Sequence, residues 1–277
     1  MKHTRFLTLT LAAALLLVAS CAEPIDPVVK HEGGGSGSQS GKETPSQPGT
    51  TTDSTIVVGV CKSGMTSTTQ GYYKKCLGDA GAKVVFFEKY ADPALATEYV
   101  GQVDAVIIPG STANDTTGRS TYDNNIIREA IAKGKPMLGI CYGHQRINVV
   151  KGGKTTAVTE TYPNSTVQHK ITDGSTNVGL NTLAHKISID TTSTLYKLLG
   201  NSTLMVNTSH NYCTSTMAAG LKVVARADDG LVEAYEGTNV MGVQFHPEVL
   251  YGKMGISIHL EIFKNLVSQA KSVKFKK

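Results

Sequence analysis

An apolar segment that ends in a cysteine between two glycines constrains the fold more than any other feature of the sequence. The segment occupies residues 135–145 and reads Lys-Pro-Met-Leu-Gly-Ile-Cys-Tyr-Gly-His-Gln. Its apolar part predicts a buried strand, and a helix is expected to follow as far as Val150. Gly139 and Gly143 allow a tight turn whose crowded centre excludes side chains. The spacing therefore predicts a nucleophile elbow with Cys141 at its tip.

Such a turn has chemical consequences for Cys141. The following helix directs its unpaired N–H groups and its positive end toward the sulfur, which favours the thiolate over the thiol. We expect the sulfur to project at the carboxyl ends of the strands, where open α/β sheets bind ligands. A small, buried, apolar cysteine at a strand end is the alternative interpretation.

Short apolar runs alternate with helical patterns over residues 55–277. Strands are expected at Ile56–Val60, Lys83–Glu88, Ala105–Pro109 and Met137–Ile140, with helices between them at Thr68–Ala80, Pro93–Gly101 and Tyr122–Lys133. Further strands at hairpin-like spacing are expected at Leu204–Asn207, Leu221–Arg226, Val232–Glu236 and Val240–Phe245, before a closing helix at Ile256–Ala270. The alternation predicts a single α/β domain with a mostly parallel sheet flanked by helices, and leaves residues 152–185 unassigned.

Residues 1–20 have the pattern of an export signal. A basic start precedes an apolar run from Phe6 to Val18, which is short for a membrane span. Cys21 follows Leu-Val-Ala-Ser, and this arrangement resembles the lipobox of bacterial lipoproteins, in which signal peptidase cuts before a cysteine that carries the lipid. The resemblance implies lipid anchoring to a bacterial membrane, periplasmic or at the cell surface. A plain secretory peptide is the alternative.

Residues 21–54 predict a flexible tether between this signal and the domain. They hold a Gly/Ser run at 33–38, two prolines and a Thr/Ser run, with almost nothing to bury. A flexible coil of this length spans roughly 30 Å on average.

Charge and cysteine usage exclude several classes of protein. The net charge of +5 falls to +3 without Lys2 and Arg5, which is too weak to indicate a nucleic-acid partner. Five scattered cysteines favour neither a disulfide framework nor a zinc motif. Four histidines also lack the spacing of metal ligands (His144, His169, His185 and His259). No nucleotide motif is present, so the sequence predicts neither a metal nor a cofactor.

A candidate base follows about a hundred residues after the cysteine. Val-Gln-Phe-His246-Pro-Glu248 lies at the end of another apolar strand. His246 is suited to accept the thiol proton, and Glu248 to hold the second imidazole nitrogen. Alone, a His-Pro-Glu triplet is more often a turn at a strand end. Together with the predicted elbow at Cys141, it indicates a catalytic pair.

The two motifs together resemble the class I glutamine amidotransferase-like superfamily, whose hallmarks are a G-x-C-x-G-x-Q elbow and a late His-Pro-Glu. Within that superfamily the chain is particularly similar to the γ-glutamyl-γ-aminobutyrate hydrolase family, peptidase family C26. Three further segments carry the likeness (Ile107–Ser111, Val206–Asn211 and Gly220–Ala234). The resemblance extends from about Ile56 to Phe263 and implies a flavodoxin-like, class I glutamine amidotransferase-like fold.

The resemblance also implies a reaction. A Cys141–His246–Glu248 triad would hydrolyse a γ-glutamyl amide through a thioester, with a small γ-glutamyl compound as the only implied partner besides the membrane. Backbone N–H groups of Tyr142 and Ser111 would hold the oxyanion, since Gly110 lets the backbone approach closely. In the superfamily the position of Gln145 lines the glutamyl pocket, and the segment of Asn207 and His210 lies near the active site. The sequence does not indicate an oligomeric state.

Some residues depart from the family pattern. Tyr142 stands where an arginine is frequent, Asn211 replaces the second histidine of a pair, and Tyr122-Asp123 replaces Arg-Asp. These changes leave the expected triad intact but put the leaving amine in doubt. Two alternatives stay open: a glutaminase subunit that supplies ammonia to a synthetase, and a binding module that kept the fold without turnover.

Overall fold

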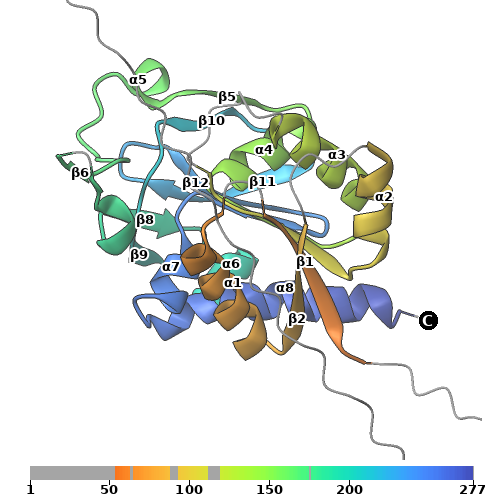
Figure 1. Cartoon of the computed structure of the whole chain (residues 1–277). Coiled ribbons are helices and arrows are strands. Elements are labelled where there is room, and N and C mark those ends of the chain that lie inside the picture. Colours follow the sequence, from red (N-terminus) through yellow and green to blue (C-terminus); the bar gives the residue numbers. More distant parts are fainter. Residues whose placement is uncertain (1–53, 63–64, 88–92, 112–118, 175, 277) are drawn as a thin grey trace, which may run out of the picture. The chain divides into compact units, whose positions relative to one another are not determined.

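The computed structural model describes residues 54–62, 65–87, 93–111, 119–174 and 176–276. The export signal, the lipobox residue Cys21 and all but the last residue of the expected tether lie outside these residues. The described chain belongs to one compact unit that spans Thr52–Lys277, built around a single large sheet (Figure 1).

The nine strands of this sheet divide into a parallel half and an antiparallel half. The parallel half has the order β2-β1-β3-β4-β13 (Ala82–Phe87, Ile56–Cys61, Ala105–Ile108, Met137–Ile140 and Val240–Val243). The antiparallel half continues as β12-β11-β8-β9 (Val232–Gly237, Leu221–Ala227, His185–Ile189 and Thr203–Val206). Only β12 and β8 run against the direction of the other strands, so the predicted mostly parallel sheet is confirmed.

Helices cover both faces of the sheet, as its buried strands require. On one face α2, α3 and α4 (Pro93–Gly101, Arg119–Ala132 and Tyr142–Val150) pack on one another. On the other face α1, α6, α7 and α8 (Ser67–Asp79, Thr194–Leu199, Pro247–Gly252 and Leu260–Lys274) share a second core. Alternate residues of β1 and β3 supply the two cores: Ile107 belongs to the core under α1 and α8, and Val106 and Ile108 to the core under α2 and α3. Successive side chains of a strand point to opposite faces of the sheet, so a sheet covered on both faces places them alternately in the two cores.

The segment that the sequence left unassigned forms small pieces beside the antiparallel half. β5 (Lys154–Ala157) pairs with β10 (Tyr212–Thr216), and β6 (Thr172–Asp173) pairs with β7 (Thr176–Asn177). A single turn of helix, α5 (Val158–Thr161), and a 3-10 turn, η2 (Gly179–Asn181), complete it. None of these pieces is long enough to show a period in the sequence, which explains why no prediction was possible there.

The expected elements are present with boundary shifts of a few residues. The strand expected at Lys83–Glu88 is β2, Ala82–Phe87, and Glu88 lies outside the described residues. The closing helix starts later than expected, after the 3-10 turn η3 (Ser257–His259). The sequence missed the helices α6 and α7, which are six residues each, and the strands β8 and β10, which are five residues each. Among the described residues, no helix has both the length and the apolar character needed to cross a membrane.

Candidate active site

Cys141 occupies a strained turn between β4 and α4. Its backbone has φ 51° and ψ −105°, a conformation that favours glycine and that costs a residue with a Cβ about 1–3 kcal/mol. The flanking glycines are required by contact. A Cβ on Gly143 would collide with the carbonyl oxygen of Ile108, and one on Gly139 would lie 2.7 Å from the backbone of Gly143. The turn has the predicted elbow geometry.

Cys141 lies at the carboxyl end of β4, where the sequence placed it, and its sulfur is buried there. Cys141 is only 4% exposed, and its Sγ donates a long hydrogen bond to the carbonyl oxygen of Ser209 at 3.8 Å. The backbone N–H of Cys141 donates to Val243 O at 2.8 Å, which ties the elbow to β13. The segment after β9, which the sequence placed near the site, therefore covers the thiol.

His246 and Glu248 lie where β13 ends and α7 begins. His246 Nδ1 donates to Glu248 Oε1 at 2.7 Å, and both side chains are buried. Burial alone would lower the pKa of His246, but the negative charges of Glu248 and of a Cys141 thiolate raise this pKa well above its ordinary value. The pair therefore favours an imidazolium beside the sulfur.

Asn207 fixes the backbone of the histidine. Its Oδ1 accepts from His246 N at 2.9 Å, and its Nδ2 donates to His246 O at 3.3 Å and to Leu180 O at 3.0 Å. The asparagine is fully buried, so these bonds are not shared with solvent. Asn207 thus supports the candidate base rather than lining the space beside it.

Gly110 is the meeting point of the predicted residues. A Cβ on Gly110 would lie 2.5 Å from His246 Cε1 and 3.5 Å from Cys141 Cβ. The loop after β3, the elbow and the start of α7 therefore converge within van der Waals contact. Ser111 follows Gly110 on this loop and lines the adjacent cavity.

That cavity has a volume of about 340 Å³ and borders His246 and Glu248. Its wall includes two cationic side chains, Arg119 and Lys253, and several threonines of the start of α1. The volume is in the range of small-molecule sites. Cys141 is not among the residues that line the cavity, whereas Ser209, whose carbonyl accepts from the thiol, is.

Arg119 is a residue that the sequence analysis missed. It is 2% exposed, its Nη2 donates to Pro109 O at 3.1 Å, and its Nε pairs with Asp123 Oδ2 at 2.8 Å. Its guanidinium also lies 4.5 Å from the ring centre of Tyr142. Arg119 therefore holds the loop before Gly110 against the start of α4. The pairing of Arg119 with Asp123 spans four positions of α3, which the pattern of adjacent residues does not indicate.

The other predicted residues have structural contacts. Gln145 Nε2 donates to Tyr212 O at 2.7 Å and to Gln244 Oε1 at 3.0 Å. His210 Nδ1 donates to Tyr212 O at 3.0 Å, and its ring faces the buried Glu233 rather than the thiol. His169 and His185 join His210 there, although their sequence spacing gave no sign of it.

The remaining described cysteines are free and buried. A Cys61–Cys76 bridge, which an oxidising compartment would allow, is not formed. Cys213 packs against Ala227 and Leu231, away from the elbow. The arrangement that can do chemistry is therefore the one around Gly110: a thiol at a helix start beside an imidazole that is held by a carboxylate.

Most of the chain matches a known protein family: a family model described as peptidase C26 matches residues 53–248. The chain is similar to protein NtpR of Enterococcus hirae, at 28% identity over 206 residues, covering 68% of this chain and 83% of the relative. It is also similar to γ-glutamyl-γ-aminobutyrate hydrolase PuuD of Escherichia coli, at 27% identity over 202 residues, covering 66% of this chain and 79% of the relative.

A solved glutamine amidotransferase from Thermotoga maritima superposes with a TM-score of 0.52 at 14% identity, covering 79% of this chain and 94% of that chain. At this identity the likeness concerns the fold. The described unit therefore has the class I glutamine amidotransferase fold, as the sequence predicted.

The strained backbone at Cys141 predicts which of two substitutions there gives the more stable protein. Cys141→Gly should be more stable than Cys141→Ala by about 1 kcal/mol, because glycine adopts positive φ without a Cβ penalty. Urea denaturation of both variants measures the difference. At Cys76, which lies inside α1, Cys76→Gly should instead be less stable than Cys76→Ala by about 1 kcal/mol, because glycine weakens a helix. A Cys141→Gly variant that is no more stable than Cys141→Ala would show that the turn is unstrained.

The carboxylate beside His246 predicts the direction of a pKa change. Glu248→Gln removes a negative charge that favours the imidazolium, so the pKa of His246 should fall. The imidazole Cε1 resonance of His246, followed by NMR against pH, measures this pKa. Glu236→Gln is the control, since Glu236 instead caps α6 by accepting from Leu195 N at 2.6 Å. An unchanged pKa in Glu248→Gln contradicts the pairing.

Proposed function

The chain belongs to the peptidase C26 family and is a hydrolase of the glutamine amidotransferase-like type, and on that premise we propose that it cleaves γ-glutamyl amide bonds with Cys141 as nucleophile. The observation that carries the proposal is the convergence of Cys141, Gly110 and the Glu248-bound His246. The family match and the similarity to a γ-glutamyl-γ-aminobutyrate hydrolase support the γ-glutamyl part.

The first half of the proposed reaction forms a thioester. The Cys141 thiolate attacks the γ-carbonyl carbon, and the carbonyl oxygen becomes an oxyanion held by the backbone N–H groups of Tyr142 and Ser111. The imidazolium of His246 donates its proton to the leaving amine as the C–N bond breaks. Free amine departs, and the γ-glutamyl group stays on the sulfur.

The second half releases glutamate. His246, now neutral, takes a proton from water, which attacks the thioester carbonyl. The tetrahedral intermediate collapses, the C–S bond breaks, and the thiolate and imidazolium are restored. Glu248 keeps the imidazole oriented and stabilises its charge throughout, as its 2.7 Å contact with Nδ1 allows.

The cavity beside His246 suits a γ-glutamyl group. Lys253 provides positive charge in its wall, which favours the α-carboxylate of a glutamyl substrate, whereas the charge of Arg119 is already paired with Asp123. The substrate carbonyl must reach the sulfur past Ser209, so we expect binding to replace the Cys141–Ser209 hydrogen bond with substrate contacts. The mechanism requires no cofactor.

We further propose that the protein is an exported lipoprotein that acts on γ-glutamyl peptides or other extracytoplasmic γ-glutamyl amides. The basic start, the apolar run and Cys21 support export and lipidation. Residues 21–54 then act as a tether that holds the hydrolase domain, residues 55–277, off the membrane. Neither the charge nor the motifs of the chain favour a nucleic-acid partner.

A panel of γ-glutamyl amides tests the proposed reaction. The purified protein is incubated with γ-glutamyl peptides, γ-glutamyl-aminobutyrate and glutamine, and released glutamate is quantified. Wild type should release glutamate, and Cys141→Ala should lose at least about 10³-fold in rate while keeping its fold, because the nucleophile is absent.

The panel also separates the competing activities. Preference for glutamine alone would favour an ammonia-supplying glutaminase, and activity on γ-glutamyl-aminobutyrate alone would contradict the extracytoplasmic substrates. Equal rates in wild type and Cys141→Ala would overturn the mechanism. No release from any amide, with Cys141 inert to a thiol-reactive glutamine analogue, would indicate a binding module.

Substitution of Cys21 tests the anchor. In a bacterial host, wild type should incorporate labelled fatty acid and partition into detergent, whereas Cys21→Ser should do neither, because a serine cannot form the lipidated thioether. Cys213→Ser changes a buried cysteine of the domain and should keep the label. A wild-type chain without lipid would favour a plain secretory signal.

A further inference from the structure

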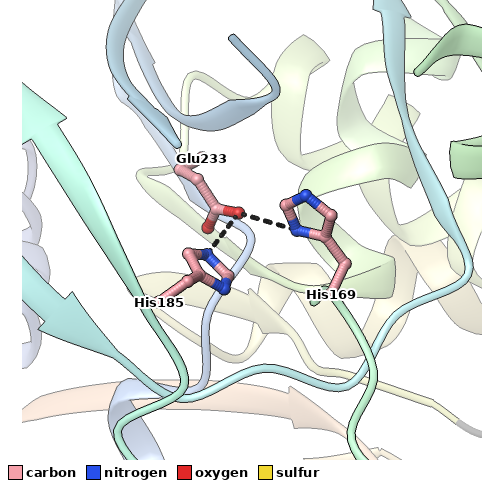
Figure 2. A group of neighbouring side chains, drawn as sticks. All are labelled: His169, His185 and Glu233. Atoms are coloured by element: carbon pink, nitrogen blue, oxygen red, sulfur yellow. Dashed lines mark hydrogen bonds and ion pairs between the residues drawn. The ribbon is translucent and has the colours of Figure 1, made fainter. Parts of the chain in front are cut away.

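Three buried histidines surround one buried glutamate in the antiparallel half of the molecule. His185 begins β8, Glu233 lies on β12, and His169 and His210 lie on the segments before β6 and β10. All four side chains are at most 6% exposed. Figure 2 shows His169 and His185 approaching the same carboxylate from different parts of the chain. The proposed hydrolysis uses none of these side chains.

In each ring, one nitrogen faces Glu233 (the inner nitrogen) and the other points away from it (the outer nitrogen). Each outer nitrogen lies at hydrogen-bond distance from an oxygen that can only accept a hydrogen bond. His169 Nε2 lies 2.8 Å from Asp229 Oδ2, His185 Nδ1 lies 3.3 Å from Gln168 O, and His210 Nδ1 lies 3.0 Å from Tyr212 O. Each outer nitrogen must therefore carry a proton. In a neutral imidazole, the inner nitrogen then carries no proton, and its lone pair points toward Glu233.

All three inner nitrogens face the same oxygen of Glu233. The distances to Oε1 are 3.0 Å from His185 Nε2, 3.7 Å from His169 Nδ1 and 3.8 Å from His210 Nε2. One proton can bridge His185 to Oε1, but the other two distances are too long for hydrogen bonds. Among the described residues, the two remaining inner nitrogens and Glu233 Oε2 have no hydrogen-bond partner. Lone pairs aimed at a buried carboxylate repel it unless a cation lies between them.

The spacing of the donor atoms of His169, His185 and Glu233 is compatible with a metal site, and His210 approaches the same carboxylate oxygen. In a tetrahedral site with bonds of about 2.0–2.1 Å, neighbouring donor atoms lie about 3.3 Å apart. The three observed distances fall on both sides of this value, and the donor atoms of His169, His185 and Glu233 all lie within 4.8 Å of one another. The outer acceptors match the carboxylate and carbonyl groups that orient metal-binding histidines.

The charges also balance for a divalent ion. Glu233 contributes one negative charge, and Asp229, behind His169, contributes a second; the Asp229 side chain is only 8% exposed. With three neutral imidazoles, a divalent cation would make this buried group of residues neutral. Without a cation, the two carboxylates leave two negative charges to be compensated by protons alone.

We propose that His169, His185, His210 and Glu233 bind one divalent transition-metal ion, with zinc as the ion that best suits three imidazoles and a carboxylate. Four protein ligands leave no open position, so the ion is structural. It joins β8 and β12 to the segment that follows β9. That segment carries Asn207, which holds the backbone of His246, and Ser209, whose carbonyl accepts from Cys141.

Metal analysis of the full-length protein tests the site. Wild type, produced with zinc in the medium and dialysed against metal-free buffer, should retain about one ion per chain by mass spectrometry. Glu233→Gln should retain less than about a tenth of an ion, because one ligand is lost and the others are no longer neutralised. His259→Leu is the matched control, since His259 is a buried histidine outside the cluster, and it should retain the ion.

A second measurement needs no variant. Chelation of wild type with dipicolinate should lower Tm, and added ZnCl₂ should restore it, because the ion binds only the folded chain. Substitution with CoCl₂ should give the visible absorption of four-coordinate Co²⁺. Wild type that holds less than about a tenth of an ion and has a Tm unaffected by chelator or ZnCl₂ overturns the proposal. Equal metal in wild type and Glu233→Gln also overturns it, since the ion would then lie elsewhere.

Discussion

The close contact between the turn at Cys141 and the end of β3 is the constraint on which the candidate site depends. Gly143 lies against the carbonyl of Ile108 with no room for a Cβ, and Gly110 lies against both His246 and Cys141. These contacts let three backbone segments meet where only glycine allows it. The meeting places a strained cysteine at the start of α4, next to an imidazole. A larger residue at either glycine would separate Cys141 from His246.

The antiparallel half of the sheet acts as a support for this contact. Asn207 and Ser209 reach across from the segment after β9, one to the backbone of His246 and one to the thiol. Both contacts depend on where that segment lies, and His210 of the same segment reaches the histidine and glutamate cluster. The two halves of the sheet thus differ: the parallel strands present Cys141 and His246, and the antiparallel strands hold the segment that covers the thiol.

Much of this arrangement could be predicted from short patterns. The elbow was found because Gly139, Cys141 and Gly143 are close in sequence, and His246 with Glu248 for the same reason. Helices such as α3, with its apolar spacing, were found by their period. The sequence analysis failed where elements are short, as for α6 and α7, and where partners come from distant segments. Arg119 is an example, because its contacts with the loop after β3 and with Tyr142 depend on packing.

The sequence by itself determined the α/β class, and it predicted the reacting residues and a signal at the N-terminus, because each is encoded within a few neighbouring positions. Only the tertiary structure decided that the sulfur is buried under Ser209, that Asn207 serves the base, and that His169 and His185 share Glu233. These are relations between residues separated by tens of positions. Their distances are set by how the sheet and its covering segments pack, and no local period or spacing encodes them.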